Sequence, residues 1–362
     1  MEQMEIMKAG DAGRTIARIK VIGVGGGGCN AVRRMMHQHN QVRGVEYAVM
    51  NTDVKSLELT SGVNSIHHSI QIGSHLTQGF GAGGDAKVGE LAARENMMVL
   101  QKVLRGADLV FIAAGMGGGT GTGSAPVVAE IAREAGALVV AVVTTPFSFE
   151  GAKRAEVALG GLRRLIERVH STIVVPNDHL LRLGDHDVPV REAFAAADRV
   201  VAEGITAISE LVNIPGEINC DLADVKKVMS IPGIAIMTTG RGEGPNAAEH
   251  AAEEVIFEPL LETHVHGAKG VLFTFTGGPD LTLGSVQRAA TIIAKHVDPA
   301  ASIFFGMNLA KEELTGQVKI NLVATGIRQS VETGWFAGVK QNVKSAAQVQ
   351  PGKLTRLSMK YA

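Results

Sequence analysis

Cysteine is scarce in this chain: Cys29 and Cys220 are the two cysteines among its 362 residues. Two thiols this far apart in sequence make neither a disulfide framework nor a metal site, and a reducing cytoplasm is the simplest location for them. The chain also lacks an apolar stretch of the roughly 18 uncharged residues that a transmembrane helix needs. Residues 1–18 lack the apolar core of a secretory signal, and the net charge of −1 gives no general attraction to nucleic acid. We therefore expect a cytoplasmic globular protein that binds no nucleic acid and reaches a membrane only indirectly.

Short apolar, β-branched runs alternate with helical segments along the first half of the chain. We expect these runs to be strands, at residues 19–24, 47–50, 109–112, 138–143 and 173–175. Continuous apolar runs separated by helices are typical of a parallel sheet that is covered on both faces. The pattern predicts a Rossmann-like, doubly wound α/β domain, which binds its ligand at the carboxyl ends of the strands.

The second half of the chain begins with a long helical pattern, from about Val188 to the stop at Ile214-Pro215-Gly216. Beyond it we expect a smaller α+β domain without a nucleotide of its own, with a helix from about Leu222, three strands and a helix near residues 283–296. The expected segments are a flexible N-terminus (1–16), a nucleotide-binding domain (17–190), a central helix (191–213), a C-terminal domain (214–330) and a short basic tail (331–362).

Glycine is plentiful, with 44 residues, and its densest run is residues 117–123, Gly-Gly-Gly-Thr-Gly-Thr-Gly. This run lies between an expected strand and a helix expected from about Pro126. Free N–H groups and the positive end of the helix dipole attract phosphate at such a turn. Thr120 and Thr122 add hydroxyl donors, although a simple glycine-rich hinge is the alternative.

A second glycine loop, residues 23–30, follows the first strand and matches G-x-G-x-x-G. Together with Asp53, which lies after the second strand, it is also compatible with an NAD-dependent dehydrogenase. Two phosphate loops at two strand ends, with a third glycine-rich loop at residues 79–85, suit a triphosphate better than one bridging pyrophosphate.

The run at residues 117–123 resembles the signature of the tubulin/FtsZ family of GTPases, and the order of the other loops is similar to its FtsZ branch of bacterial division proteins. The resemblance extends over about residues 17–326. It implies GTP and GDP as ligands, Mg²⁺ between the β- and γ-phosphates, and K⁺ as a further candidate ion, with no metal ligand assigned to the side chains. It also implies a set of nucleotide-contacting residues: Gly25, Gly26, Gly27, Gly28, Asn30, Asn51, Asp53, Gly81, Ala82, Gly83, Gly117, Gly118, Gly119, Thr120, Gly121, Thr122, Gly123, Pro146, Glu150, Arg154, Asn177, Phe194 and Asp198.

Four of these residues suit the sugar and the base. The Glu150 carboxylate can accept from ribose hydroxyls, while the Arg154 guanidinium can hold phosphate, although the two are also typical of a solvated surface pair. Phe194 and Asp198 are spaced i,i+4 and share a helix face. Phe194 offers a stacking surface, or else belongs to the core, and Asp198 can accept from the N1–H and amino group of guanine, a donor pair that adenine lacks.

Asn219, Asp221 and Asp224 match the family's Asn-x-Asp-x-x-Asp loop, whose acids position or polarise the attacking water. Locally, the two acids are also typical of a helix N-cap followed by a first-turn acid. At 1.5 Å per residue, the long helix separates Asp198 from this loop by roughly 20 Å. The acids would therefore serve the GTP of another subunit, and such a head-to-tail contact generates a filament.

The sequence leaves three functions open. The first is a GTPase that polymerises with itself into the division ring at mid-cell and is anchored there by membrane adaptors and regulators. The second is a paralogue that forms filaments for another cytoskeletal task, and the third is the dehydrogenase. The third loop has Asp85-Ala86-Lys87 where the family more often has a proline, and the basic tail is compatible with a shortened adaptor-binding peptide, a weak membrane contact or a frayed terminus.

Overall fold

The structure is a computed structural model that describes residues 16–37, 42, 44–60, 66–180, 189–214, 216–232, 234–257, 265–309 and 314–327. The expected C-terminal tail and nearly all of the expected N-terminal segment lie outside the described residues. Within the described residues, no helix is both long and apolar enough to cross a bilayer.

The described strands form one sheet in the order β3-β2-β1-β4-β5-β6-β7-β10-β8-β9. β1 to β6 run parallel to one another, whereas β10 is antiparallel to both β7 and β8. The strands have these bounds: β1 Ile19–Val24, β2 Val45–Asn51, β3 His68–Gln71, β4 Leu109–Gly115, β5 Leu138–Thr145, β6 Ser171–Pro176, β7 Ile234–Glu243, β8 Gly270–Gly277, β9 Ser302–Asn308 and β10 Gln317–Thr325.

The strand order changes direction between β1 and β4, which pair in register from Ile19 with Leu109 to Val24 with Ala114. β2 and β3 continue to one side of β1, while β5 and β6 continue to the other side of β4. The connections after β1 and β4 therefore leave to opposite faces and open a crevice at the carboxyl ends of these two strands. Both glycine loops lie at this position.

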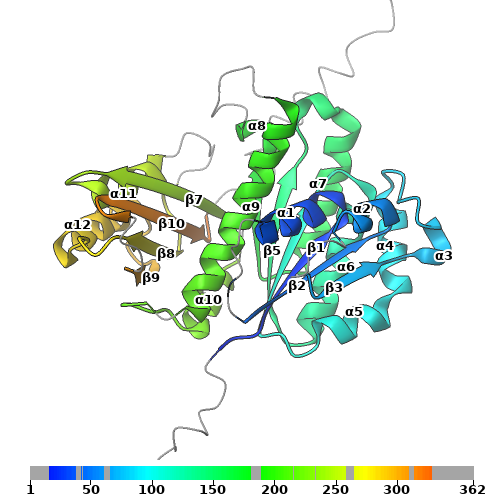
Figure 1. The fold of residues 1–362 in the computed structure, drawn as a ribbon, viewed down its shortest axis with the longest axis horizontal. Coiled ribbons are helices and arrows are strands. Elements are labelled where there is room, and N and C mark those ends of the chain that lie inside the picture. Colours follow the sequence, from blue (N-terminus) through cyan, green and yellow to red (C-terminus); the bar gives the residue numbers. More distant parts are fainter. Residues whose placement is uncertain are drawn as a thin grey trace, which may run out of the picture.

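Helices cover both faces of the parallel strands, as the sequence predicts (Figure 1). Successive residues of a strand point to opposite faces, so that Val21 of β1 joins a cluster with α1, α9 and α10, and Ile22 joins one with α4 to α7. The helices have these bounds: α1 Gly25–His37, α2 Val54–Glu58, α3 Ser74–Thr77, α4 Ala86–Glu95, α5 Met97–Leu104, α6 Gly119–Glu134, α7 Ala152–Ile166, α8 Asn177–Leu180, α9 Val190–Asn213, α10 Leu222–Met229, α11 Ala247–Phe257 and α12 Leu283–Ala294.

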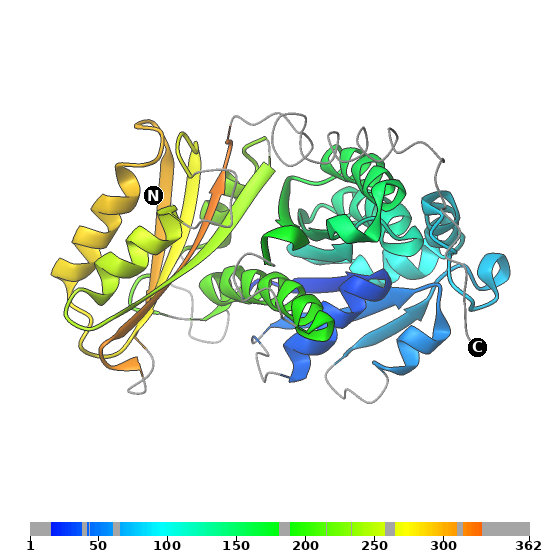
Figure 2. The same cartoon turned by 90° about the horizontal axis from the view of Figure 1, so that it is seen from above.

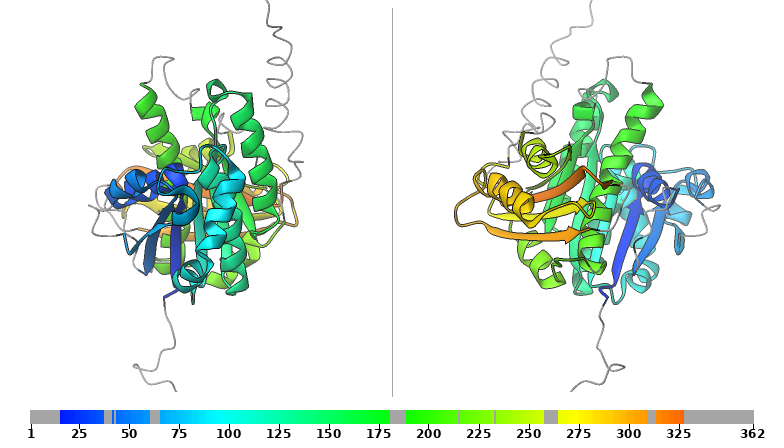
Figure 3. Two further views of the ribbon diagram at one scale, coloured as in Figure 1. Left: turned by 90° about the vertical axis from the view of Figure 1, so that its right-hand side faces the viewer. Right: turned by 60° about the vertical axis from the view of Figure 1, so that its left-hand side comes forward.

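The long helix α9 lies between the N-terminal strands and a second layered unit made of β7 to β10 with α11 and α12 (Figures 2 and 3). That unit has its own core, in which Ile236, Phe273 and Ile320 pack beneath the two helices. β6 and β7 join the two units through two register positions. Gly204 lets α9 approach closely, because a Cβ there would overlap the Met237 side chain of β7.

The structure confirms the expected α/β fold class, with a long helix and a smaller C-terminal unit. The strands β3 and β9, the short helices α2, α3 and α8, and the helix α11 were not predicted. The prediction for the helix after the glycine run was wrong at its start, because α6 begins at Gly119 and contains Pro126 in its interior. Tertiary packing explains the difference, since a Cβ at Gly119 or Gly123 would overlap the segment that begins α4. Close packing here prevails over the poor helix propensity of glycine.

Candidate nucleotide-binding site

Two helix N-termini meet at the β1/β4 crevice. α1 begins at Gly25, directly after β1, and α6 begins at Gly119, four residues after β4 ends. The N-cap of α6 is Gly118, in extended conformation and without a side-chain cap. The first N–H groups of each helix have no partner within the helix itself, so the crevice presents donors and two positive dipole ends to an anion.

The two glycine loops interlock. Gly25 has φ +70°, and a Cβ on it would lie 2.7 Å from the amide nitrogen of Gly121. A Cβ on Gly27 would lie 3.2 Å from the Cα of Gly115. In contrast, a Cβ on Gly26 or Gly118 would meet no atom within 4 Å. Backbone thus packs on backbone at the base of the crevice, while Gly26 and Gly118 border open space.

The two threonines of the run at residues 117–123 are engaged within the protein. Thr120 Oγ1 lies 2.7 Å from Thr52 Oγ1, which joins the start of α6 to the end of β2. Thr122 is 0% exposed, and its hydroxyl accepts a hydrogen bond from the Gly117 N–H at 2.8 Å. The structure therefore places Thr122 behind the phosphate loop, where it holds the Gly117 turn, while Thr120 lies at the buried edge.

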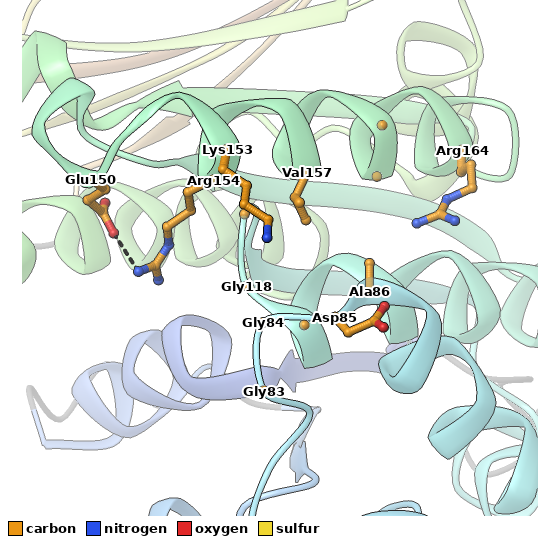
Figure 4. Close-up of a pocket in the computed structure, with 14 residues that line it drawn as sticks. Gly83, Gly84, Asp85, Ala86, Gly118, Glu150, Lys153, Arg154, Val157 and Arg164 are labelled. Carbon is orange, nitrogen blue, oxygen red and sulfur yellow. Dashed lines mark ion pairs between the residues drawn. The ribbon is translucent and has the colours of Figure 1, made fainter. Parts of the chain in front are cut away.

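A cleft of about 910 Å³ opens beside the same loops (Figure 4). Its floor is formed by residues 83–86 and 117–119, and its roof by α7. In Figure 4 the Lys153 and Arg154 side chains reach down from α7 toward the glycine loops, with Arg164 further along the helix. The third loop packs on the first turn of α6, where a Cβ on Gly119 would lie 2.8 Å from Ala82 Cβ. Gly83 thus lines the cleft, and Ala82 is buried against α6.

Glu150 and Arg154 form an ion pair at the mouth of this cleft, with 3.0 Å between Arg154 Nη1 and Glu150 Oε2. Glu150 also accepts from the Phe147 N–H at 2.9 Å, which fixes its orientation. The Arg154 stem covers Gly117, since a Cβ there would lie 2.9 Å from Arg154 Cγ and 3.3 Å from Pro146 Cγ. The structure therefore brings Pro146, Glu150 and Arg154 together over the first glycine of the run.

An aromatic group lies near the N-terminal end of α9. Phe147 is buried and meets Phe194 edge to face and Phe149 in a stack, each at 5.0 Å between ring centroids. Phe194 is 40% exposed, so its ring is an open surface rather than core. Asn177, at the end of β6, is buried, and its Oδ1 has no hydrogen-bond partner among the described residues. An unpaired buried amide oxygen of this kind suits a donor supplied by a ligand.

Asp198 lies one turn after Phe194 on α9, and its carboxylate pairs with Arg34 of α1, at 3.3 Å. Burial raises the pKa of Asp198 to about 6, and the charges of Arg34 and Arg33 oppose this shift. The ordinary value for an aspartate is near 3.9. Arg33 donates to Asn30 Oδ1 at 3.2 Å, so α1 brings Asn30 and both arginines to the side that faces α9.

Asn51 and Asp53 follow β2, and both are already engaged. Asn51 Oδ1 accepts from the N–H groups of Thr52 and Asp53. Asp53 caps α2, accepting from the Lys55 N–H at 3.1 Å and the Ser56 hydroxyl at 2.8 Å. These contacts give both residues a local role in shaping the loop beneath Thr52.

The expected catalytic loop lies beyond the opposite end of α9, beside α10 and away from α8 (Figure 1). Asn213 fixes that end of α9 by exchanging two hydrogen bonds with the backbone of Ala17, both 3.1 Å long. Asn219 accepts from the Gly216 N–H at 2.6 Å. Asp221 and Asp224 form a reciprocal capping box, in which Asp221 accepts from the Asp224 N–H at 2.8 Å and Asp224 from the Asp221 N–H at 3.3 Å.

The structure thus groups the expected nucleotide contacts at one end of α9 and leaves Asn219, Asp221 and Asp224 at the other. Residues beside the nucleotide contacts that were not predicted include Arg34, Thr52, Lys153 and Arg164. Arg34 had a usable signal, because it follows Asn30 by four residues and shares its helix face. Across the described residues, no group of three or more His, Cys, Asp or Glu side chains is placed to hold a metal ion.

Comparisons with known proteins agree with this geometry. Residues 18–185 match the model of the Tubulin/FtsZ family GTPase domain, and residues 233–328 match that of the FtsZ family C-terminal domain. Among solved structures, an empty FtsZ dimer from M. jannaschii is 38% identical, with 86% of this chain and 89% of that chain covered and a TM-score of 0.80. A GTPγS-bound protofilament of CetZ2 from Haloferax volcanii is 21% identical, with 91% and 99% covered and a TM-score of 0.73, and shows the same fold. The chain belongs to the tubulin/FtsZ family of GTPases.

Proposed function

We propose that this protein polymerises head to tail and hydrolyses GTP at the contact between subunits. The observation that carries the proposal is the separation of the β1/β4 crevice from Asp221 and Asp224 by the length of α9. From Asp198 to the helix end, 15 residues at 1.5 Å give roughly 20 Å. One subunit therefore offers the nucleotide pocket at one end and the acids at the other, and stacking two subunits joins the two halves.

In the pocket, the N–H groups of residues 25–28 and 118–121 bind the phosphates, and Glu150 binds the ribose. Asn177 and Asp198 accept from guanine, whose ring stacks on Phe194. Mg²⁺ bound with the nucleotide would neutralise charge that develops on the phosphates, with K⁺ as a further candidate ion. From the next subunit, Asp221 and Asp224 orient the attacking water, with Asn219 assisting.

Each acid retains capacity for this task. An ionised carboxylate has about four acceptor positions, and the capping box occupies one oxygen of each: Asp221 Oδ1 and Asp224 Oδ2. Asp221 is exposed and Asp224 half-buried, so both can meet a second subunit. The capping box also holds the two carboxylates at a fixed spacing at the start of α10. The acids are thus already positioned before two subunits come together.

We further propose that the filament is the division ring at mid-cell, in the cytoplasm, linked to the membrane through adaptors and controlled by regulators. The likeness to FtsZ over both matched segments supports this role. The dimer of M. jannaschii FtsZ and the protofilament of CetZ2 support self-assembly as the family's working state. In this proposal residues 17–190 bind GTP, residues 191–213 connect, and residues 214–330 supply the acids. The family assignment replaces the dehydrogenase alternative.

Sedimentation tests this function directly. With GTP, we expect the protein to pellet and to release phosphate in the same samples, because occupied pockets dock the next subunit. With GDP or without nucleotide, we expect most of the protein to stay in the supernatant. An equal pellet in all three samples, or phosphate release without any pellet, would contradict the proposal.

A further inference from the structure

We propose that Arg34 is a positioning residue for guanine recognition, which keeps the Asp198 carboxylate ionised and in one orientation before the base arrives. The inference rests on the proposed binding of guanine at Asp198. It adds a residue from α1 to a recognition site otherwise assigned to α9. Arg34 would act through Asp198 and need not touch the nucleotide.

The contact between the two residues is made across a helix pair. α1 and α9 pack together on one face of the sheet, and Arg34 Nη2 lies 3.3 Å from Asp198 Oδ2. The Asp198 side chain is 15% exposed and that of Arg34 32% exposed, so water screens the pair only partly. Arg34 Nε is buried without a hydrogen-bond partner among the described residues, which leaves the pair with Asp198 as the principal contact of the guanidinium.

The surroundings of Asp198 make this contact necessary. Burial favours the neutral acid and raises the pKa to about 6, while Arg34 and then Arg33 favour the charged form. β5 and β6, which also pack on α9, contribute no charged side chain. Asp178 of α8 is engaged by the Ser148 N–H and hydroxyl. Arg34 is therefore the main group that opposes the effect of burial.

The charge state of Asp198 decides whether the base can bind. An ionised carboxylate accepts from N1–H and from the amino group of guanine with its two oxygens, whereas a neutral acid has one oxygen that carries a proton. Binding competence is thus present above the pKa of Asp198 and is lost as the pH falls through it. Without Arg34, only Arg33 opposes the effect of burial, so the pKa of Asp198 rises. Base binding is then lost from a higher pH downward.

The test measures the affinity for fluorescent GDP at pH 8, 7 and 6, with protein kept dilute, for wild type, Arg34→Met, Arg34→Lys and Arg199→Met. If removing the arginine charge raises the pKa by about one unit, Arg34→Met loses about tenfold in affinity between pH 8 and pH 6, against about twofold for wild type. Arg34→Lys keeps a cation and is expected to follow wild type. Arg199 directly follows Asp198 in the chain, but its charge does not act on the Asp198 carboxylate. Arg199→Met is therefore also expected to follow wild type.

Titration of the nucleotide itself is common to all four proteins, so the differences between their pH profiles report on Asp198. A profile for Arg34→Met that parallels wild type, even at weaker affinity throughout, would overturn the proposal and leave a merely structural arginine. So would an Arg34→Lys profile that follows Arg34→Met. Wild-type protein that binds no GDP at any pH would contradict the proposed function instead.

Discussion

Replacing Asp224 by alanine is expected to lower GTP turnover per subunit by about a hundredfold or more, while nucleotide binding and filament formation remain. In the proposed filament, Asp224 lies far from the pocket of its own subunit and reaches the phosphates of the next one. Its loss therefore removes the group that orients the attacking water and leaves the glycine loops untouched. The measurement is phosphate release and sedimentation in the same GTP samples.

The capping box requires a second variant. Asp224 accepts from the Asp221 N–H, so alanine also removes a helix cap, at a cost of about 1 kcal/mol in stability. Asp224→Asn keeps an acceptor of the same size without the charge, and we expect it to lose turnover as alanine does. Glu217→Ala, an exposed acid in the same loop, is the matched control and should retain turnover. Near-normal turnover in Asp224→Asn would assign this acid to capping alone.

Replacing Gly121 by alanine is expected to weaken GTP binding by about a hundredfold or more, because it separates the two phosphate loops. A Cβ at this position would lie 2.6 Å from Gly115 O and 3.3 Å from Val24 O, both of them backbone atoms that cannot rotate away. Relief requires α6 to move from β1 and β4, and overpacking of this kind typically costs about 1–3 kcal/mol in stability. Nucleotide affinity and the melting temperature measure the two effects.

Gly284→Ala is the matched control for this substitution. Gly284 lies in α12 of the C-terminal unit, and a Cβ there would make only ordinary contacts, 3.5 Å from Arg288 and 3.9 Å from Thr282. Alanine at an unstrained helical position adds up to about 1 kcal/mol of stability. We therefore expect unchanged GTP affinity in this variant. Normal GTP affinity in Gly121→Ala would show that the two loops do not act as one cradle.

The glycine loops and the parallel strands could be predicted from sequence because their signals are local. Each loop directly follows an apolar run, and the two loops meet because both strands end at the same edge of the sheet. The start of α6 could not be predicted in this way, since it depends on close packing of Gly119 and Gly123 against α4. β3 was missed because an edge strand with two exposed residues carries no continuous apolar run.

In the site as well, features with a local sequence signal could be predicted, and contacts that depend on folding could not. The i,i+4 spacing of Phe194 and Asp198 could be derived from the helical pattern. The spacing of Arg34 from Asn30 was a signal of the same kind, but the contact of Arg34 with Asp198 could not be derived, because α1 and α9 meet only in the folded protein. The hydroxyl of Thr122 was expected to face phosphate, whereas burial turns it to the Gly117 N–H. Asp221 and Asp224 match two patterns at once, a helix cap and a catalytic loop. The isolated subunit displays the cap, and the catalytic role remains a proposal for the filament.

The claim that one subunit completes the active site of the next is tested most directly by GTP turnover per subunit across a series of protein concentrations. We expect almost no turnover in dilute protein and a rise above a threshold, at the concentration where the same samples begin to pellet. Asp224→Asn should pellet above a comparable threshold without the rise in turnover. Turnover per subunit that stays constant down to dilute monomer would contradict the shared site.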